Sequence, residues 1–152
     1  MAISIDYNLT GRGWSECIIE INDQHAHLTA CYLSDALADL LNATTIVLRG
    51  TEEATASFTE EPGEYRWRLK RVAPGRLYIN IVWFDEISRD RPDECGKVIL
   101  TAQCRLRTFA GGILSASQRV LATHGLEGYQ KKWVNHEFPV KLHCLLQESL
   151  SR

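Results

Sequence analysis

The sequence of 152 residues has no apolar run long enough to cross a membrane, and it carries acidic Asp6 where an export signal carries positive charge. These absences predict a cytoplasmic protein without membrane contact. A strong excess of one charge is also lacking, since the net charge is −2 and 45% of the residues are hydrophobic. This composition excludes disorder and fibrous repeats, and the length predicts one domain over residues 1–152.

Cysteine and histidine lack the spacing of a metal or redox site. The five cysteines include no C-x-x-C pair, so we expect reduced thiols that are mostly buried. His25 and His27 share one side of a predicted strand and Cys31 follows, but no third ligand stands at a defined spacing. The sequence therefore predicts no metal and no cofactor.

Catalytic motifs are missing as well. No G-x-S-x-G is present, and the "AGG" at 110–112 lacks the lysine and Ser/Thr of a phosphate loop. We can name no catalytic residue, and a non-enzymatic protein is favoured. One alternative stays open, a small-molecule-binding protein or enzyme with a pocket between sheet and helices that uses His124, Tyr129 or Cys104.

Alternating apolar and polar residues are the main positive signal for secondary structure. They predict a meander of strands over 3–30, a strand at 54–60, a hairpin over 64–84 that turns at "APG", and a strand at 97–106.

Helical spacing of apolar residues appears in three places. The first helix is predicted from about 34 to 48 with Ser34 as its N-cap, and the second from Thr108, also an N-cap, to Gly125. Pro139 separates two short helical candidates near the C-terminus. The fold class is therefore α+β, with a curved antiparallel β-sheet of about six strands packed on one face by two main helices and short C-terminal helical segments.

Charge is arranged in blocks along the chain. The interval from Glu52 to Glu64 contains five glutamates and no base, whereas the interval from Arg66 to Arg76 contains five bases and no acid. Strand periodicity places Arg66, Arg68 and Lys70 on one face, with Arg76 across the turn. This row favours a solvated face over a protein-binding patch. Nucleic-acid binding is the weaker alternative, because Tyr65 and Trp67, on which bases would stack, point the other way.

Acidic residues and tryptophans supply the remaining candidates for contact with a partner. The acids of the loop after residue 84 favour a solvated loop or an acidic contact surface, while Trp14 and Trp133 are interpreted as exposed anchors. The complete set of candidate partner-binding residues is Glu60, Glu61, Arg66, Arg68, Lys70, Arg76, Asp85, Glu86, Asp90, Asp93, Glu94, Trp14 and Trp133.

The segments "YLSDAL", "EPGEYRW", "WFDE", "LRTFAGGIL" and "HGLEGY" resemble stretches of short, uncharacterised bacterial proteins. The resemblance implies a stand-alone bacterial domain and carries no activity with it.

Together these patterns favour a non-enzymatic cytoplasmic protein-interaction domain, because blocks of opposite charge are suited to orienting a protein partner. A toxin-immunity protein or an adaptor is a specific version, in which the acidic segments 52–64 and 85–94 cover a basic active site such as that of a nuclease. The partner itself is not identified, and an open edge at the N-terminal strand allows a homodimer.

Overall fold

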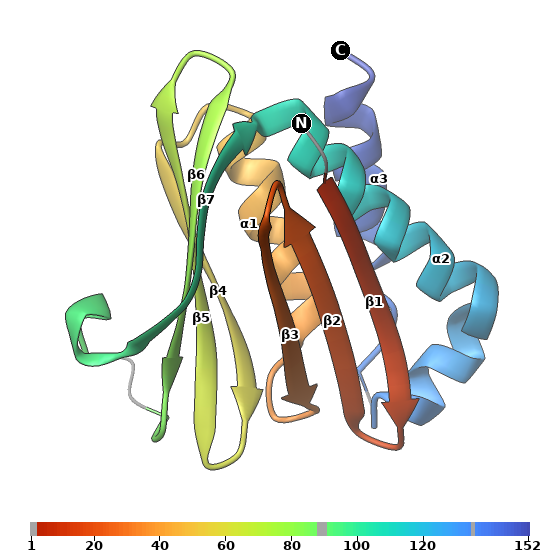
Figure 1. The fold of residues 1–152 in the computed structure, drawn as a ribbon. Coiled ribbons are helices and arrows are strands. Elements are labelled where there is room, and N and C mark those ends of the chain that lie inside the picture. Colours follow the sequence, from red (N-terminus) through yellow and green to blue (C-terminus); the bar gives the residue numbers. More distant parts are fainter. Residues whose placement is uncertain (1–2, 88–90, 135) are drawn as a thin grey trace.

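The computed structural model describes residues 3–87, 91–134 and 136–152, which form an α+β fold of two antiparallel sheets and three α-helices (Figure 1). The first sheet contains β1 (Ile3–Gly11), β2 (Trp14–Ile21) and β3 (Gln24–Cys31). The second contains β4 (Glu53–Glu60), β5 (Gly63–Ala73), β6 (Arg76–Phe84) and β7 (Lys97–Arg105). The helices are α1 (Ala36–Leu48), α2 (Leu106–Lys132) and α3 (Val140–Leu150), and a 3-10 turn, η1, covers Asp93–Cys95.

Antiparallel pairing and helical cover agree with the sequence prediction, but the single sheet of about six strands does not. The described strands divide into sheets of three and four because α1 follows β3 and packs against β4. β4 is the edge strand of the four-stranded sheet. The amide of its Thr59 donates a hydrogen bond to Ser34 Oγ at 3.0 Å, so this amide is bonded to the loop after β3 and not to a neighbouring strand.

The three-stranded sheet follows the predicted alternation. Ile5, Tyr7 and Leu9 of β1 are buried, whereas the residues between them are exposed. The turn between β2 and β3 uses Asn22 with φ of 57°, a left-handed conformation that asparagine tolerates better than most residues. This sheet therefore has one face in the core and one face in solvent.

The first helix begins later than predicted. Ser34 does not cap it, because its hydroxyl accepts the Thr59 amide, and no side chain caps the N-terminus of α1. Thr44 and Thr45 lie buried inside the helix, where their hydroxyls donate to the carbonyls of Leu40 and Leu41 at 2.7 Å. These bonds satisfy polar groups that would otherwise be costly in the core.

The second helix is longer than predicted at both ends. It starts at Leu106, directly after β7, so Thr108 is not its cap. Gly125 interrupts it with φ of 69° and ψ of 178°, after which the helix continues to Lys132. Gly125 therefore marks a kink where the sequence predicted an end, and α3 begins after Pro139 as expected.

A single cluster of buried side chains joins both sheets and all three helices. One aromatic contact crosses between the sheets, since the ring centroids of Tyr7 on β1 and Phe58 on β4 lie 6.2 Å apart. Within the four-stranded sheet, the ring centroids of Phe58 and Trp67 lie 5.3 Å apart. In Figure 1 the helices lie behind the three-stranded sheet, and α2 runs past β1. The turns at the two ends of the strands remain outside this core.

None of the described helices combines the length and the apolar character needed to cross a membrane.

Candidate functional site

The arginine row on β5 is not a solvated face, which corrects the sequence interpretation. Arg66 is only 7% exposed, and its guanidinium stacks on the Phe84 ring at 4.3 Å. Arg66 Nη1 and Arg68 Nε donate to opposite oxygens of Asp93 at 3.1 and 2.7 Å. Alternation along β5 predicted the shared face correctly, but the fold brings the η1 turn over that face.

Asp93 is the centre of this ionic cluster. The hydrogen bond from Arg68, and secondarily the one from Arg66, lowers the pKa of the Asp93 carboxyl below its usual value. Asp93 in turn raises the pKa of Arg68. Arg66 Nη1 also donates to the Arg91 carbonyl at 2.6 Å, so the turn is held by both side-chain and backbone acceptors.

This arrangement removes the support for nucleic-acid binding through β5. Arg66 and Arg68 are bound to Asp93, whereas Lys70 is exposed further along the strand. Arg76 lies beyond the hairpin turn at the start of β6 and pairs in register with Arg105 of β7. The predicted row is thus divided between an internal ion cluster and the opposite end of the molecule.

Three chain segments meet at the lower end of the molecule in Figure 1, which we call the acidic end: residues 32–39, 58–64 and 84–87. Their neighbourhood is fixed by backbone contacts. Thr59 bonds to Ser34, Glu64 pairs in register with Phe84, and the Ile87 amide donates to the Pro62 carbonyl at 3.0 Å.

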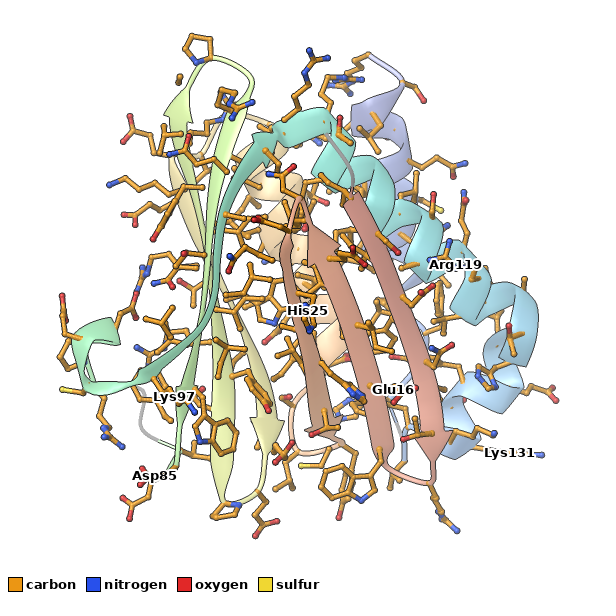
Figure 2. The ribbon with its side chains drawn as sticks, in the orientation of Figure 1. Glu16, His25, Asp85, Lys97, Arg119 and Lys131 are labelled. Atoms are coloured by element: carbon orange, nitrogen blue, oxygen red, sulfur yellow. The ribbon has the colours of Figure 1, made fainter. Side chains whose placement is uncertain are left out.

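The acidic end contains seven carboxylates and no lysine or arginine within those segments, namely Asp35, Asp39, Glu60, Glu61, Glu64, Asp85 and Glu86. Among the described residues, three basic side chains border it, and one of them is Arg66, whose Nη2 lies 3.7 Å from Glu64 Oε1. Arg91 Nη1 pairs with Asp85 at 3.2 Å, and Lys97 lies on β7 in register with Trp83. Figure 2 shows Asp85 at this end with Lys97 above it. Among the described residues, carboxylates therefore outnumber basic side chains at this end.

Among the other predicted acids, Glu94 is exposed in η1, on the far side of β5 and β6 from the core. Asp90 lies outside the described residues. Asp93 is a structural ion-pair partner and not a free contact residue. Of the predicted acids, Glu60, Glu61, Asp85 and Glu86 lie at the acidic end, and the fold adds acids there that the sequence analysis did not select.

A cleft of about 440 Å³ opens within the acidic end, between the start of α1 and the outer face of β4 and β5. It is lined by Leu33, Ser34, Asp35, Asp39, Thr55, Ser57, Thr59, Glu64, Arg66 and Ile87. Glu64 is 4% exposed and accepts a hydrogen bond from Ser57 Oγ at 2.6 Å. Polar groups thus dominate the cleft, with two aliphatic side chains among them.

Burial perturbs the acids here. Desolvation raises the pKa of Asp35, an effect that His136 opposes and Asp39 reinforces. Burial also raises the pKa of Glu60, and burial together with Glu60 raises that of Tyr65. Desolvation, more than repulsion between the acids, therefore disfavours the charged forms of these groups.

Exposed apolar side chains lie at the same end. Tyr32, Leu33 and Ile87 are each about half exposed, and Trp14 is 43% exposed beside Tyr32, whose amide donates to the Gly13 carbonyl. Large side chains in such positions are typical of protein contact surfaces. Trp14 is thus available for contact, as predicted.

Trp133 does not fit the prediction that it is an exposed anchor. It is 0% exposed, and its backbone amide closes the last turn of α2 on the Tyr129 carbonyl. The kink at Gly125 redirects the end of α2, so the amphipathic pattern after residue 125 buries Trp133 instead of presenting it.

The polar groups proposed for a ligand pocket do not come together. Tyr129 and Cys104 are completely buried in the core, where burial raises the pKa of both and brings that of Cys104 to about 11. His124 lies on α2 just before the kink, and burial lowers its pKa. None of these three residues lines the four hollows of the described chain that begin at Gly11, Leu33, Asp35 and Leu48.

The histidine pair on β3 is directed outward. His25 is exposed on the solvent face of the three-stranded sheet, where Figure 2 also shows Glu16. His27 Nε2 contacts Glu16 Oε2 at 2.9 Å. The described residues contain no group of three side chains suited to hold a metal ion.

The other end of the molecule is basic, and we call it the basic end. Residues 70–76 and 105–107 contain five lysines and arginines and no acid. Arg49, Arg107 and Arg152 line one hollow of about 310 Å³ there. This end lies at the top of Figure 1, and it also contains acids, since Glu53 pairs in register with Lys70 and Glu148 lies 3.1 Å from Arg152. Basic side chains nevertheless outnumber acidic ones among the described residues there.

Several residues of the acidic end were missed by sequence reasoning. The glutamates before the arginine row were noted, but Asp35 and Asp39 were interpreted only through the dipole of α1. Glu64 has the alternation of a solvent-facing residue, and only the position of the β3–α1 loop shows that it is buried. The sequence signal that could have indicated these residues is their position, because each acid lies near the end of a predicted strand or the start of a predicted helix.

The sequence matches no protein-family model and no curated protein. A solved structure described as the CdiA-CT/CdiI toxin and immunity complex from Enterobacter cloacae contains a similar chain, with a TM-score of 0.49 and 16% identity. The similarity covers 77% of this chain and 99% of that chain. Identity at this level does not indicate which residues of this chain contact a partner.

Proposed function

We propose that this chain is a non-enzymatic protein-interaction domain whose acidic end covers a basic surface on a protein partner. The observation that carries the proposal is the convergence of seven carboxylates from three chain segments, where they outnumber the basic side chains of the described residues that border them. A concentrated charge of one sign accelerates encounter with an oppositely charged surface and rejects partners of like charge.

The exposed apolar residues give the acidic end a second property of a contact surface. Charge steers association, whereas affinity comes mainly from buried aromatic and aliphatic anchors. Trp14, Tyr32, Leu33 and Ile87 are exposed where the carboxylates gather. One end of the molecule thus combines both requirements.

A toxin-immunity protein is the specific version that we favour. A nuclease toxin must neutralise phosphates with lysine and arginine, so its active site is basic. A protein that blocks such a site has to present carboxylates over a compact area, which the acidic end does. An adaptor with a basic partner would use the same surface.

Charge reversal tests the proposal. The acidic-end variant carries Glu60→Lys, Glu61→Lys, Asp85→Lys and Glu86→Lys, all at positions outside the core. The matched control makes the same change in net charge on exposed positions elsewhere: Glu20→Lys, Asp23→Lys, Glu127→Lys and Glu148→Lys. Both variants should retain the wild-type circular dichroism spectrum.

Each tagged protein is incubated with extract from its host at several salt concentrations, and retained proteins are identified by mass spectrometry. We expect a stoichiometric partner that the wild type and the control variant retain, that salt releases, and that the acidic-end variant loses. Equal retention by all three proteins would show that the acidic end is not the contact surface.

A further inference from the structure

A hollow of about 720 Å³ opens beside the β1–β2 turn, and we call it the Lys131 hollow. It lies between that turn and the last turns of α2. Two backbone features bring these segments together. The Gly13 amide donates to the Lys132 carbonyl at 2.6 Å, and the kink at Gly125 redirects the end of α2. The hollow is therefore formed by two segments that are distant in the sequence.

Three cationic side chains and one carboxylate line the Lys131 hollow. Arg12, Lys131 and Lys132 are exposed, and no described residue forms a hydrogen bond or an ion pair with their side chains. The carboxylate is that of Glu127, whereas Glu137 lines a separate hollow. The C-terminal end of a helix adds about half a negative charge. The three cations outweigh this helix end and Glu127 together, so the hollow is basic.

Exposed aromatic side chains adjoin the Lys131 hollow. Gly11 lines the hollow and pairs in register with Trp14 across the turn. A Cβ on Gly13 would lie 2.7 Å from Tyr32 Cδ1, so the Tyr32 ring lies against the same turn. Trp14 and Tyr32 are 43% and 44% exposed. The aromatic residues at the acidic end therefore also border the hollow.

The acidic end and the Lys131 hollow lie on different sides of these aromatic residues. Figure 2 shows Asp85 and Lys131 at opposite sides of the lower part of the molecule. In Figure 1 the ends of β2 and β3 that carry Trp14 and Tyr32 lie between those sides. Protein contact surfaces typically have an apolar, aromatic-rich centre and a polar rim. The lower part of the molecule has this arrangement, with acidic groups on one side of the rim and basic groups on the other.

We infer that the Lys131 hollow receives an acidic segment of the protein partner, whose aspartate or glutamate side chains pair with Arg12, Lys131 and Lys132. Charge-assisted hydrogen bonds from arginine and lysine are suited to carboxylates. This inference rests on the proposed function, because it adds a second contact with the partner whose basic surface the acidic end covers. Opposite charges on neighbouring parts of one interface fix the orientation of the two proteins.

A nucleic-acid strand fits the Lys131 hollow less well than a protein carboxylate does. Phosphates repeat along the whole strand, and a protein must neutralise several of them with lysine or arginine. A strand that continued past Trp14 and Tyr32 would meet the carboxylates of the acidic end. The acidic segment of a folded protein can instead be limited to the hollow.

A short peptide tests the hollow without knowledge of the partner. The full chain, labelled with nitrogen-15, is titrated at low salt with a capped peptide of alternating aspartate and glutamate while amide chemical shifts are followed by NMR. The matched control peptide has asparagine and glutamine at the same positions, and an oligothymidine of equal charge is the third probe. We expect saturable shifts in residues 11–14 and 127–134 with the acidic peptide. The neutral peptide should bind at least about fivefold more weakly, because it loses several ion pairs that are individually weak.

Variants locate the binding site. Arg12→Gln and Lys131→Gln each remove one exposed cation that lines the hollow, whereas Lys70→Gln removes an exposed cation at the basic end. We expect each hollow variant to weaken the acidic peptide about threefold, as the loss of one exposed ion pair does, and Lys70→Gln to change its binding less than about 1.5-fold. Shifts confined to residues 70–76 and 105–107, equal binding of the neutral peptide, tighter binding of oligothymidine, or equal effects of Lys131→Gln and Lys70→Gln would each overturn the inference.

The host-extract experiment separates this inference from the proposed function. A chain with Arg12→Glu and Lys131→Glu should retain less of the partner than the wild type, whereas the control with Lys70→Glu and Arg105→Glu, two exposed positions at the basic end, should retain as much. A partner that the acidic-end variant loses and the hollow variant keeps would overturn the inference and leave the proposed function standing. A partner that the acidic-end variant keeps would overturn the proposed function, while the peptide titration still decides whether the hollow binds carboxylates.

Discussion

Replacing Asp93 by asparagine should destabilise the folded chain, because Asp93 is the counterion that two arginines share. Arg66 Nη1 and Arg68 Nε lie 3.1 and 2.7 Å from its carboxylate oxygens. Removing one partner of a fully buried ion pair costs about 3–5 kcal/mol. Here Asp93 and Arg68 keep 21% and 33% of their side chains exposed, so solvent screens part of the interaction. We therefore expect a loss of about 2 kcal/mol in the free energy of unfolding.

The measurement is urea unfolding at pH 7, with Glu94→Gln as the control. Glu94 is the next residue, is exposed, and changes the net charge by the same amount, so its substitution should alter stability by less than about 0.5 kcal/mol. A further readout is the slope of unfolding against denaturant concentration, which should stay constant if only stability changes.

The effect of Asp93 should also depend on pH in a defined direction. Its pKa is lower in the folded chain than in the unfolded chain, where an aspartate titrates near about 3.9. Its contribution is therefore complete above that unfolded value and is lost as the pH falls through the folded pKa. The stability difference between wild type and Asp93→Asn should be largest near neutral pH and should shrink below about pH 4. Equal stability of the two proteins at pH 7, or a difference that grows in acid, would refute the assigned role.

Two further substitutions test the assigned packing, each with a matched control. Trp133→Ala should lower the free energy of unfolding in urea by about 3–5 kcal/mol, because Trp133 is completely buried. The control Trp14→Ala, at a site that is 43% exposed, should lower it by less than about 1 kcal/mol. Similar losses in the two variants would contradict the assignment of Trp133 to the core. Gly63→Ala should lower the melting temperature, because a Cβ there would lie 2.4 Å from the Phe84 carbonyl oxygen and overpacking costs about 1–3 kcal/mol. Gly11→Ala, where a Cβ meets nothing within 4 Å, should be tolerated, and an equal shift in the two variants would argue against this close approach.

Local structure was largely predictable from the sequence, because alternation and turn residues act over a few positions. The three N-terminal strands, the 64–84 hairpin and its Pro74–Gly75 turn all appear where period-two patterns and turn chemistry placed them. Helix ends were less accurate. Ser34 and Thr108 have the chemistry of N-caps. The Ser34 hydroxyl, however, accepts the distant Thr59 amide, and at Thr108 the helix has already begun at Leu106, directly after β7.

The candidate site was predictable only in part, because its geometry depends on contacts between distant segments. The acids at 60, 61, 85 and 86 were selected from charge blocks, yet their proximity to Asp35 and Asp39 follows from the path of β3 into α1. Periodicity correctly placed Arg66 and Arg68 on one face of β5, opposite Trp67, where both bond to Asp93. The alternation along β5 contains no information on the η1 turn. This turn lies over the face that carries Arg66 and Arg68, and its Asp93 forms ion pairs with both.

The opposite charges of the acidic and basic ends constrain self-association through symmetry. A two-fold dimer places identical surfaces against each other, so a pair joined through the acidic ends would oppose the exposed carboxylates of one copy, such as Glu61, Asp85 and Glu86, with the same residues of the other. Attraction between copies would instead join the acidic end of one to the basic end of the next. Such a head-to-tail contact is heterologous, and it produces open chains unless the rotation closes a ring. The charge pattern therefore disfavours a two-fold homodimer through the acidic end.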